Sequence, residues 1–292
     1  MLLAISARFL RFVLFCAALF LLSCKAEFTE DFQLFLKKNY GSEVKGNLSR
    51  DDLGLFGMGS FGGKANSTVT ITNRPVIFVH GVTQRAGAFA HHRLSFGLAG
   101  YGDHELYATS WGDGGITPMY NEMLRCSHAK QMRQFITAVS EYADSEVDVI
   151  AYSMGVAVSR KAILGGPCVD TNEDLGEAIT SRVNTFIALA GVVHGVEFCP
   201  EIVPACNSLN GFVCNSKYLE ELNKQSERFE GESTYSIYSA DDRLVGQDCC
   251  GSKCSELPNS NRTIVRHGHT HITLFYATID VQKNLAKHSF VL

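Results

Sequence analysis

The sequence predicts an α/β fold with a mostly parallel sheet flanked by helices, and two observations support this prediction. Short apolar runs rich in β-branched residues alternate along the chain with segments of helical periodicity. These runs are also apolar throughout, as expected for parallel strands that are covered on both faces. Strands that alternate with helices imply right-handed crossovers, and therefore a mostly parallel sheet.

Length and composition favour one globular domain behind a targeting segment. The chain has 292 residues, of which 46% are hydrophobic and 19% are charged, so it can bury a sizeable core. Arg8 and Arg11 precede an apolar run over residues 12–22, and small residues follow. The run is too short to span a bilayer comfortably. We therefore expect a cleaved signal peptide over residues 1–26, no transmembrane span, and a single domain over residues 27–292.

The charge of the mature chain argues against nucleic acid as a partner. Cleavage removes three basic residues and leaves 23 Lys and Arg against 30 Asp and Glu, a net charge of about −7 with His neutral. Three N-glycosylation sequons agree with a secreted, extracellular glycoprotein. Their acceptors are Asn47, Asn66 and Asn261.

Eight cysteines remain after the signal peptide, and in a secreted chain they favour disulfides. Their pairing is left open by the sequence. Zinc is the alternative, because Cys250 and Cys254 have tolerable ligand spacing, but no matching Cys/His pair follows them. The disulfide candidates are Cys126, Cys168, Cys199, Cys206, Cys214, Cys249, Cys250 and Cys254.

In the N-terminal part, residues 28–40 predict an amphipathic helix with Thr29 as its cap and Gly41 as its end. The Gly-rich residues 54–63 lack the spacing of a phosphate loop and read as a flexible connector, with Phe56 and Phe61 on the surface. Residues 68–72 alternate like an edge strand.

The later elements follow the alternating pattern. We expect a central strand over residues 75–79, a strand over 104–111, a long helix over 120–142, and buried strands over 147–150 and 183–191. Residues 235–238 and 263–266 predict two further strands.

The turn after residues 147–150 carries the candidate nucleophile. Ala151-Tyr152-Ser153-Met154-Gly155 places small residues two positions before and after a serine, which lets the chain reverse sharply and expose the hydroxyl. A helix with its apolar face at Val156, Val158, Ile163 and Leu164 follows. The motif is short enough to occur by chance as an ordinary strand-turn-helix connection. A matching acid and base elsewhere in the sequence are therefore needed to support Ser153 as a nucleophile.

Candidate partners stand at the ends of two later strands. A triad acid must orient an imidazole, and we choose Asp242 over its neighbour Asp241, which suits a turn-making role. The base is one of the histidines 267, 269 and 271. We choose His271, because it opens a predicted helix as the serine does. The alternate spacing of the three histidines also suits metal ligands, but Gly268 interrupts the strand that would align them, so we expect no metal.

Ser153, Asp242 and His271 occur in the order Ser, Asp, His, which is the order of the α/β-hydrolase fold. In that fold the backbone after the 75–79 strand approaches the serine turn, so the N–H groups of Val82 and Met154 are candidates to hold an oxyanion. For His80 we favour a structural role.

Five stretches together resemble the class 2 lipases, which are small secreted lipases of bacteria and nematodes: R-P-V-I-F-V-H-G-V, L-Y-A-T-S-W-G, V-D-V-I-A-Y-S-M-G, Y-S-A-D-D-R-L-V and H-T-H-I-T-L-F-Y. The resemblance covers Arg74 to Tyr276. It implies an A-x-S-M-G elbow, so that Ala151 is expected there. It also implies that Ser153 is the nucleophile, Asp242 the acid and His271 the base. The oxyanion N–H groups that it implies are those of Val82 and Met154. Val156 departs from the Gly common in bacterial members, and the connection over residues 192–233 is absent from the shortest ones.

The function expected is hydrolysis of carboxylic esters of lipids, of the triacylglycerol lipase type, with no cofactor. A lipid ester is the expected partner, with contact to a lipid–water interface. The apolar residues 198–213 support a lipid substrate, and the connection around them is either a wall or lid of an acyl site or a disulfide-braced surface loop. The alternatives are a secreted acyltransferase and a non-catalytic lipid-binding protein on the same fold.

Overall fold

A seven-stranded sheet forms the centre of the computed structural model, which describes residues 27–54 and 58–288. The predicted signal peptide and Phe56 lie outside these residues. The strand order is β1-β3-β2-β4-β5-β6-β9, and every neighbouring pair is parallel except β1 with β3. The strands are β1 (Ser60–Phe61), β2 (Val76–Val79), β3 (Leu106–Thr109), β4 (Val147–Tyr152), β5 (Val183–Leu189), β6 (Ser233–Ser239) and β9 (Arg262–Arg266). Beside the sheet, β7 (Asp248–Cys249) and β8 (Ser252–Lys253) form a small antiparallel pair.

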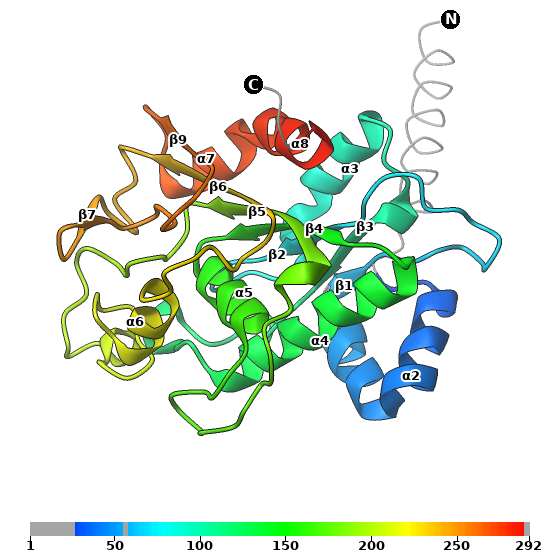
Figure 1. The fold of residues 1–292 in the computed structure, drawn as a ribbon, viewed down its shortest axis with the longest axis horizontal. Coiled ribbons are helices and arrows are strands. Elements are labelled where there is room, and N and C mark those ends of the chain that lie inside the picture. The colour runs from blue at the N-terminus through cyan, green and yellow to red at the C-terminus, as the bar shows by residue number, and fades with distance from the viewer. Residues whose placement is uncertain (1–26, 55–57, 289–292) are drawn as a thin grey trace, which may run out of the picture.

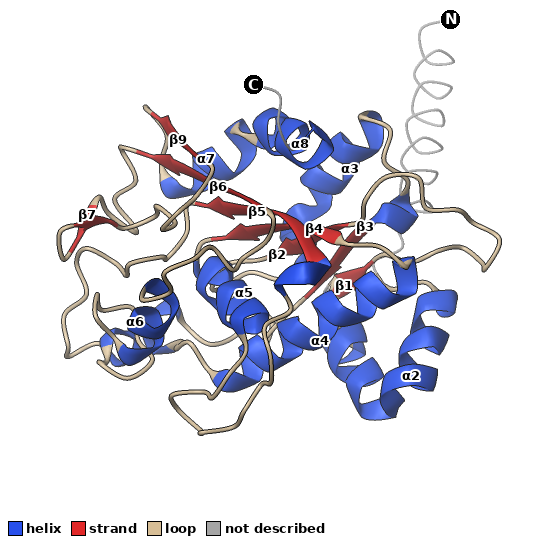
Figure 2. Cartoon of the chain, in the orientation of Figure 1, coloured by secondary structure: helices blue, strands red, loops and turns tan. Residues whose placement is uncertain are grey.

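Helices cover both faces of the sheet (Figure 1; Figure 2). One face carries α3 (Ala90–Leu98), α7 (His271–Ala277) and α8 (Ile279–His288). The other carries α2 (Glu30–Ser49), α4 (Cys126–Ala143), α5 (Met154–Leu164) and α6 (Lys217–Asn223). Side chains of β2 alternate between the two cores, Ile77 and Val79 to one and Val76 and Phe78 to the other. The predicted α/β fold, a mostly parallel sheet flanked by helices, is therefore confirmed.

The edge of the sheet differs from the prediction. Residues 68–72 form no strand, because Asn66 accepts hydrogen bonds from the N–H and hydroxyl of Thr68, and the Thr72 N–H bonds to the Glu105 carboxylate. The edge position belongs instead to β1, which was expected to be a flexible connector. Phe61 of this strand is buried in the core, so its predicted surface position is wrong.

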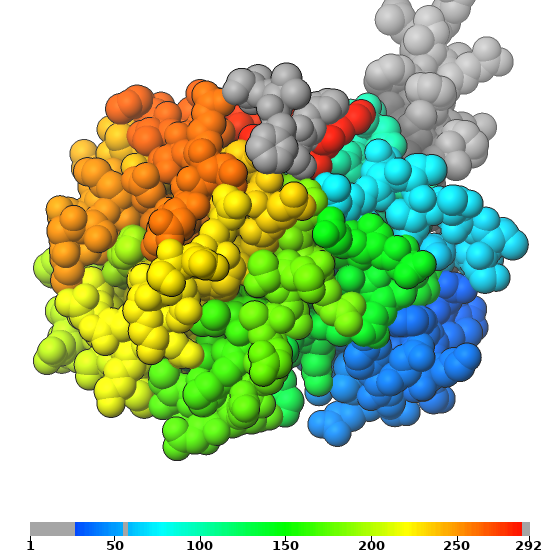
Figure 3. Space-filling model, in the orientation of Figure 1, coloured from blue at the N-terminus to red at the C-terminus, as the bar shows by residue number. Residues whose placement is uncertain are grey.

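The N-terminal helix begins as predicted and ends later. Thr29 caps α2 by accepting the N–H of Phe32. Gly41 interrupts the helix with a φ of 89°, but the chain resumes helical geometry as far as Ser49. This longer helix packs against α4, as the blue and green segments of Figure 3 show. The helix predicted from residue 120 begins only at Cys126, after a 3-10 turn at 119–121.

All eight candidate cysteines form disulfides, which confirms that prediction. The pairs are Cys126–Cys168, Cys199–Cys206, Cys214–Cys250 and Cys249–Cys254. Three of them brace the segments that follow the carboxyl ends of β5 and β6. Within residues 27–54 and 58–288, no helix has the length and hydropathy required to cross a bilayer.

Candidate active site

Ser153 lies in a strained turn between β4 and α5. Its φ is 55° and its ψ is −126°, a backbone conformation that L residues rarely adopt. The turn needs small neighbours: a Cβ on Gly155 would lie 2.3 Å from the carbonyl oxygen of His80, and a Cβ on Gly81 would lie 2.9 Å from the Cβ of Ser153. The sharp turn expected from A-Y-S-M-G is therefore present.

The structure brings Ser153, Asp242 and His271 together from three strand ends. Nε2 of His271 lies 3.0 Å from Oγ of Ser153, and Nδ1 lies 2.7 Å from Oδ2 of Asp242. All three residues are buried, with 4%, 3% and 6% of their surfaces exposed for Ser153, Asp242 and His271 respectively. A hydroxyl, an imidazole and a carboxylate in this order have the geometry of an activated nucleophile.

The environment keeps Asp242 ionised. Burial alone would raise the pKa of its carboxyl group. The hydrogen bond and charge of His271, with the N–H groups of Leu244 and Val245 on Oδ1, outweigh burial and lower the pKa below its usual value. The side chain is therefore a carboxylate that can stabilise a protonated imidazole.

His271 is the first residue of α7, and Thr270 caps that helix by accepting the Thr273 N–H. Tyr152, the residue before the serine, donates its hydroxyl to the carbonyl of His271 over 3.1 Å, and its ring lies 4.9 Å from the imidazole. This contact could not be predicted from the sequence, because the residue between Ala151 and Ser153 carries no local signal of its distant partner.

Asp241, the other candidate acid, has a different partner from Asp242. Asp241 accepts the N–H of Gly268 over 2.6 Å, so its side chain joins two loops that are 27 residues apart instead of making the local turn expected from the sequence. His267 and His269 precede His271 on the same loop. Among the described residues, the one cluster with metal-ligand spacing is Cys126, Cys168 and Asp170, and its two sulfurs are joined in a disulfide.

Val82 and Met154 flank the serine, and both line the same pocket as Ser153. Among the described residues, neither backbone N–H donates to a protein acceptor. His80 is buried and fully bonded: Nδ1 contacts the carbonyl of Gly81 at 2.8 Å, and Nε2 accepts the N–H of Trp111 at 3.0 Å. Burial lowers the pKa of His80 to about 3, so the ring is neutral.

An apolar pocket of about 280 Å³ opens at Ser153. Most of its wall comes from the connection between β5 and β6, which the Cys199–Cys206 disulfide also braces. This connection is therefore both braced and part of the pocket. Its residues in the wall are Val192, Val196, Phe198, Cys199, Pro200, Val203, Ala205, Cys206 and Phe212.

Two other hollows differ from this pocket. One of about 640 Å³ adjoins His271, Leu244 and Ile272. Another, of about 1030 Å³, is lined mainly by polar and charged residues such as Arg50, Asp113 and Glu122. Its lining contains none of the three residues of the Ser-His-Asp arrangement, and its polarity does not suit a lipid chain.

Comparison with known families agrees with this geometry. The sequence matches the family described as Lipase (class 2) over residues 73–284. The chain belongs to the class 2 lipase family. As a class 2 lipase it is an α/β-hydrolase and a carboxylic ester hydrolase. A sequence comparison with curated proteins finds no significant match.

Solved structures resemble this class 2 lipase in fold. Lipase B of Aspergillus fumigatus superposes with a TM-score of 0.57 at 16% identity, over 79% of this chain and 56% of the fungal chain, so this chain spans little more than half of that protein. The mature lipase BlEst2 of Bacillus licheniformis superposes with a TM-score of 0.54 at 12% identity, over 78% of this chain and 98% of the bacterial one. At these identities the likeness establishes the fold.

Proposed function

We propose that this class 2 lipase is a secreted serine hydrolase that cleaves lipid esters through Ser153, Asp242 and His271. The observation that carries the proposal is the continuous pair of contacts from the serine hydroxyl through the imidazole to the carboxylate, 3.0 Å and 2.7 Å long. The three residues come from distant parts of the sequence and meet in a buried site.

In the proposed reaction, Oγ of Ser153 attacks the acyl carbonyl while Nε2 of His271 takes the hydroxyl proton. The N–H groups of Val82 and Met154 stabilise the oxyanion of the tetrahedral intermediate. His271 then protonates the leaving alcohol. Water then attacks the acyl-enzyme while His271 takes its proton, and His271 returns that proton to Oγ of Ser153. Asp242 stabilises the imidazolium in both half-reactions. This mechanism requires neither a metal nor a cofactor.

The apolar pocket at Ser153 supports an acyl chain as its occupant. Its wall is formed by aliphatic and aromatic side chains and a disulfide, and it opens beside both proposed oxyanion N–H groups. The oxyanion forms from the carbonyl oxygen of the acyl group, so the acyl chain of a bound ester lies next to these N–H groups and can enter this pocket. The hollow of about 640 Å³ beside His271 is then available to the alcohol part, which must receive its proton from the imidazole.

Contact with a lipid–water interface is supported by exposed apolar side chains on the segments around the pocket. Phe198 and Ile202 are 85% and 91% exposed on the disulfide-braced connection. Apolar side chains gathered at the entrance of a site mark an interaction surface. The further exposed residues on these segments are Ile116, Met119, Tyr120, Leu244 and Ile272.

Secretion is proposed from the signal peptide over residues 1–26, with a single mature domain over residues 27–292. The four disulfides support an oxidising compartment. Glycans on Asn47, Asn66 and Asn261 are part of this proposal, and all three residues are exposed. Nucleic acid is not a proposed partner, given the negative charge of the mature chain.

The decisive experiment compares wild type with Ser153→Ala on a series of chromogenic esters from short to long acyl chains. We expect the substitution to reduce kcat by about 10⁴-fold or more. Ser159→Ala is the matched control, because this buried hydroxyl lies in α5, the helix that follows Ser153, and has no hydrogen-bond partner among the described residues. Turnover confined to short chains would favour an esterase. Transfer to added alcohol in preference to water would identify an acyltransferase, and fatty-acid binding without turnover would identify a carrier.

A further inference from the structure

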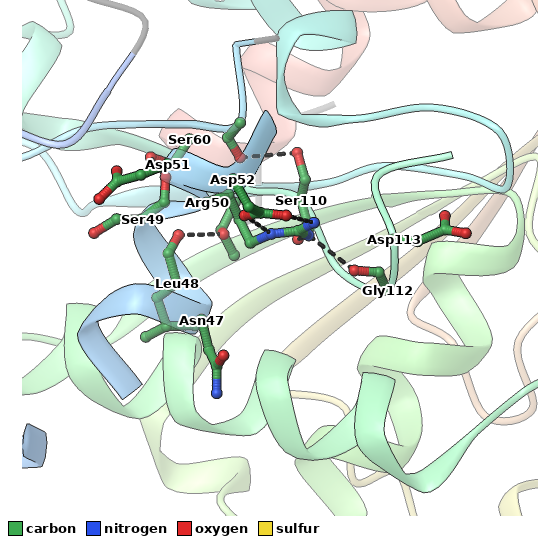
Figure 4. A network of polar contacts seen from close by, with 12 residues as sticks. Asn47, Leu48, Ser49, Arg50, Asp51, Asp52, Ser60, Ser110, Gly112 and Asp113 are labelled. Carbon is green, nitrogen blue, oxygen red and sulfur yellow. Dashed lines mark hydrogen bonds and ion pairs between the residues drawn. The ribbon is translucent and has the colours of Figure 1, made fainter. Parts of the chain in front are cut away.

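The N-terminal segment contacts the loop that follows β3, although it lies outside the family match over residues 73–284. Arg50 follows the last residue of α2 and adopts a left-handed conformation with a φ of 58°. Its guanidinium is buried, donates to the carbonyl of Ser110, and donates to the carbonyl of Gly112 over 2.9 Å. Figure 4 shows the guanidinium between these carbonyls and Asp52.

The carboxylate of Asp52 holds Arg50 in this orientation. Its two oxygens accept Nε and Nη2 of Arg50, each over 2.8 Å, so the guanidinium is bound as a planar fork. Neighbouring contacts fix the end of α2 to the same region: Thr109 donates its hydroxyl to the carbonyl of Leu48, and Ser60 donates to that of Ser49. The carbonyls left unpaired at the helix end are thus satisfied by the sheet edge.

Trp111 stands between the two carbonyls that Arg50 holds, and it bonds twice to His80. Its backbone N–H donates to Nε2 of His80 over 3.0 Å, and its indole N–H donates to the carbonyl of His80 over 2.9 Å. The two rings also stack, with centroids 4.7 Å apart and an interplanar angle of 2°. The position of His80 is therefore set by Trp111.

His80 in turn orients the peptide that follows it. Because Nε2 accepts a hydrogen bond and the ring is neutral, Nδ1 carries the proton and donates to the carbonyl of Gly81 over 2.8 Å. Gln84 donates its backbone N–H to the same carbonyl. The peptide is trans, so its carbonyl and the N–H of Val82 point in opposite directions. Fixing the Gly81 carbonyl toward the ring of His80 therefore aims the Val82 N–H away from that ring.

We propose that Arg50 is a positioning residue for the oxyanion site, acting through Trp111, His80 and the Gly81–Val82 peptide. The inference rests on the proposed function, in which the Val82 N–H stabilises the oxyanion. The N-terminal segment of this lipase then contributes to catalysis without touching the substrate.

The test is Arg50→Met, with two readouts. Losing one oxyanion donor outright costs about 100- to 1000-fold in kcat, so a donor that is only less well aimed is expected to cost about 10-fold, with KM changed by less than about 2-fold. Trp111 is the only tryptophan, so acrylamide quenching of its fluorescence reports on the same loop. We expect quenching to increase in Arg50→Met and to return partly toward wild type, together with kcat, in Arg50→Lys.

Leu36→Ala is the control for a general loss of stability, because Leu36 is fully buried in α2 and belongs to the core rather than to this network. It should lower Tm while leaving kcat and quenching near the wild-type values. The proposal is overturned if Arg50→Met leaves either kcat or quenching unchanged, or if Leu36→Ala reproduces both effects. Turnover that survives Ser153→Ala would instead refute the proposed function, while the quenching comparison still tests whether Arg50 holds Trp111.

Discussion

Oδ2 of Asp242 lies 2.7 Å from Nδ1 of His271, whereas the carboxylate of the adjacent Asp241 accepts the N–H of Gly268. Two neighbouring acids thus have different partners. Asp242→Asn removes the charge that stabilises the imidazolium, and we expect kcat to fall by about 10⁴-fold. Asp241→Asn is the matched control and should retain activity within about 5-fold, since the Asp241–Gly268 contact is not part of the Asp242–His271 pair. Steady-state kinetics on one soluble ester measures both, and the assignment fails if Asp241→Asn is the more damaging change.

His92 makes stability sensitive to acid. It is fully buried among the rings of Phe78, Phe89 and Phe275. Burial lowers the pKa of His92 to about 3. The unfolded state, with a pKa near 6.5, therefore binds a proton between about pH 6.5 and 3 that the folded state does not, so stability falls as the pH falls through this range.

His92→Phe removes this titration from a site already lined by aromatic rings. We expect the loss of stability between pH 7 and pH 4 to shrink by roughly 3 kcal/mol. Thermal denaturation across this pH range measures it, with His91→Phe as the exposed neighbouring control. An unchanged pH dependence in His92→Phe would show that His92 is not a source of acid sensitivity.

The pocket at Ser153 predicts a change in chain-length preference. Val203 is half-buried and lines the pocket, so Val203→Phe should fill part of its 280 Å³. Long acyl chains then lose contact area that short chains never use. We expect kcat/KM to fall about 10-fold for long-chain esters and less than about 2-fold for short ones, since a few methylenes are worth about 0.8 kcal/mol each. An equal loss at all chain lengths would place the acyl chain elsewhere.

The exposed apolar residues around the pocket predict a difference between dispersed and aggregated substrates. Ile202→Asp places a charge at a 91% exposed position on the disulfide-braced connection. Activity on emulsified ester should fall several-fold, while activity on a monomeric soluble ester stays unchanged. Leu98→Asp is the matched control, because Leu98 is 82% exposed at the end of α3 and outside the pocket lining. Equal behaviour of the two variants would contradict an interface role for the connection.

Local signals in the sequence predicted much of the fold. The cap at Thr29 depends on the conformation of a few neighbouring residues, and the structure has the cap hydrogen bond in the expected place. The central strands were also recognisable, because complete burial requires continuous apolar runs. The edge of the sheet was not predictable in this way. Thr72 bonds to Glu105, which is 33 residues away, and no local pattern indicates that contact.

The sequence by itself determined the α/β class, the sharp turn at Ser153, the Ser, Asp, His order of the candidate site and the tendency of the eight cysteines to pair. Each follows from chain order, composition or the steric requirements of a few consecutive residues. The sequence also favoured Asp242 over Asp241, and the structure pairs Asp242 with His271. The tertiary structure alone decided which cysteines join and how Arg50 and Trp111 hold His80. Those outcomes depend on where segments far apart in the sequence come to lie, because hydrogen bonds and disulfides form only at contact distance.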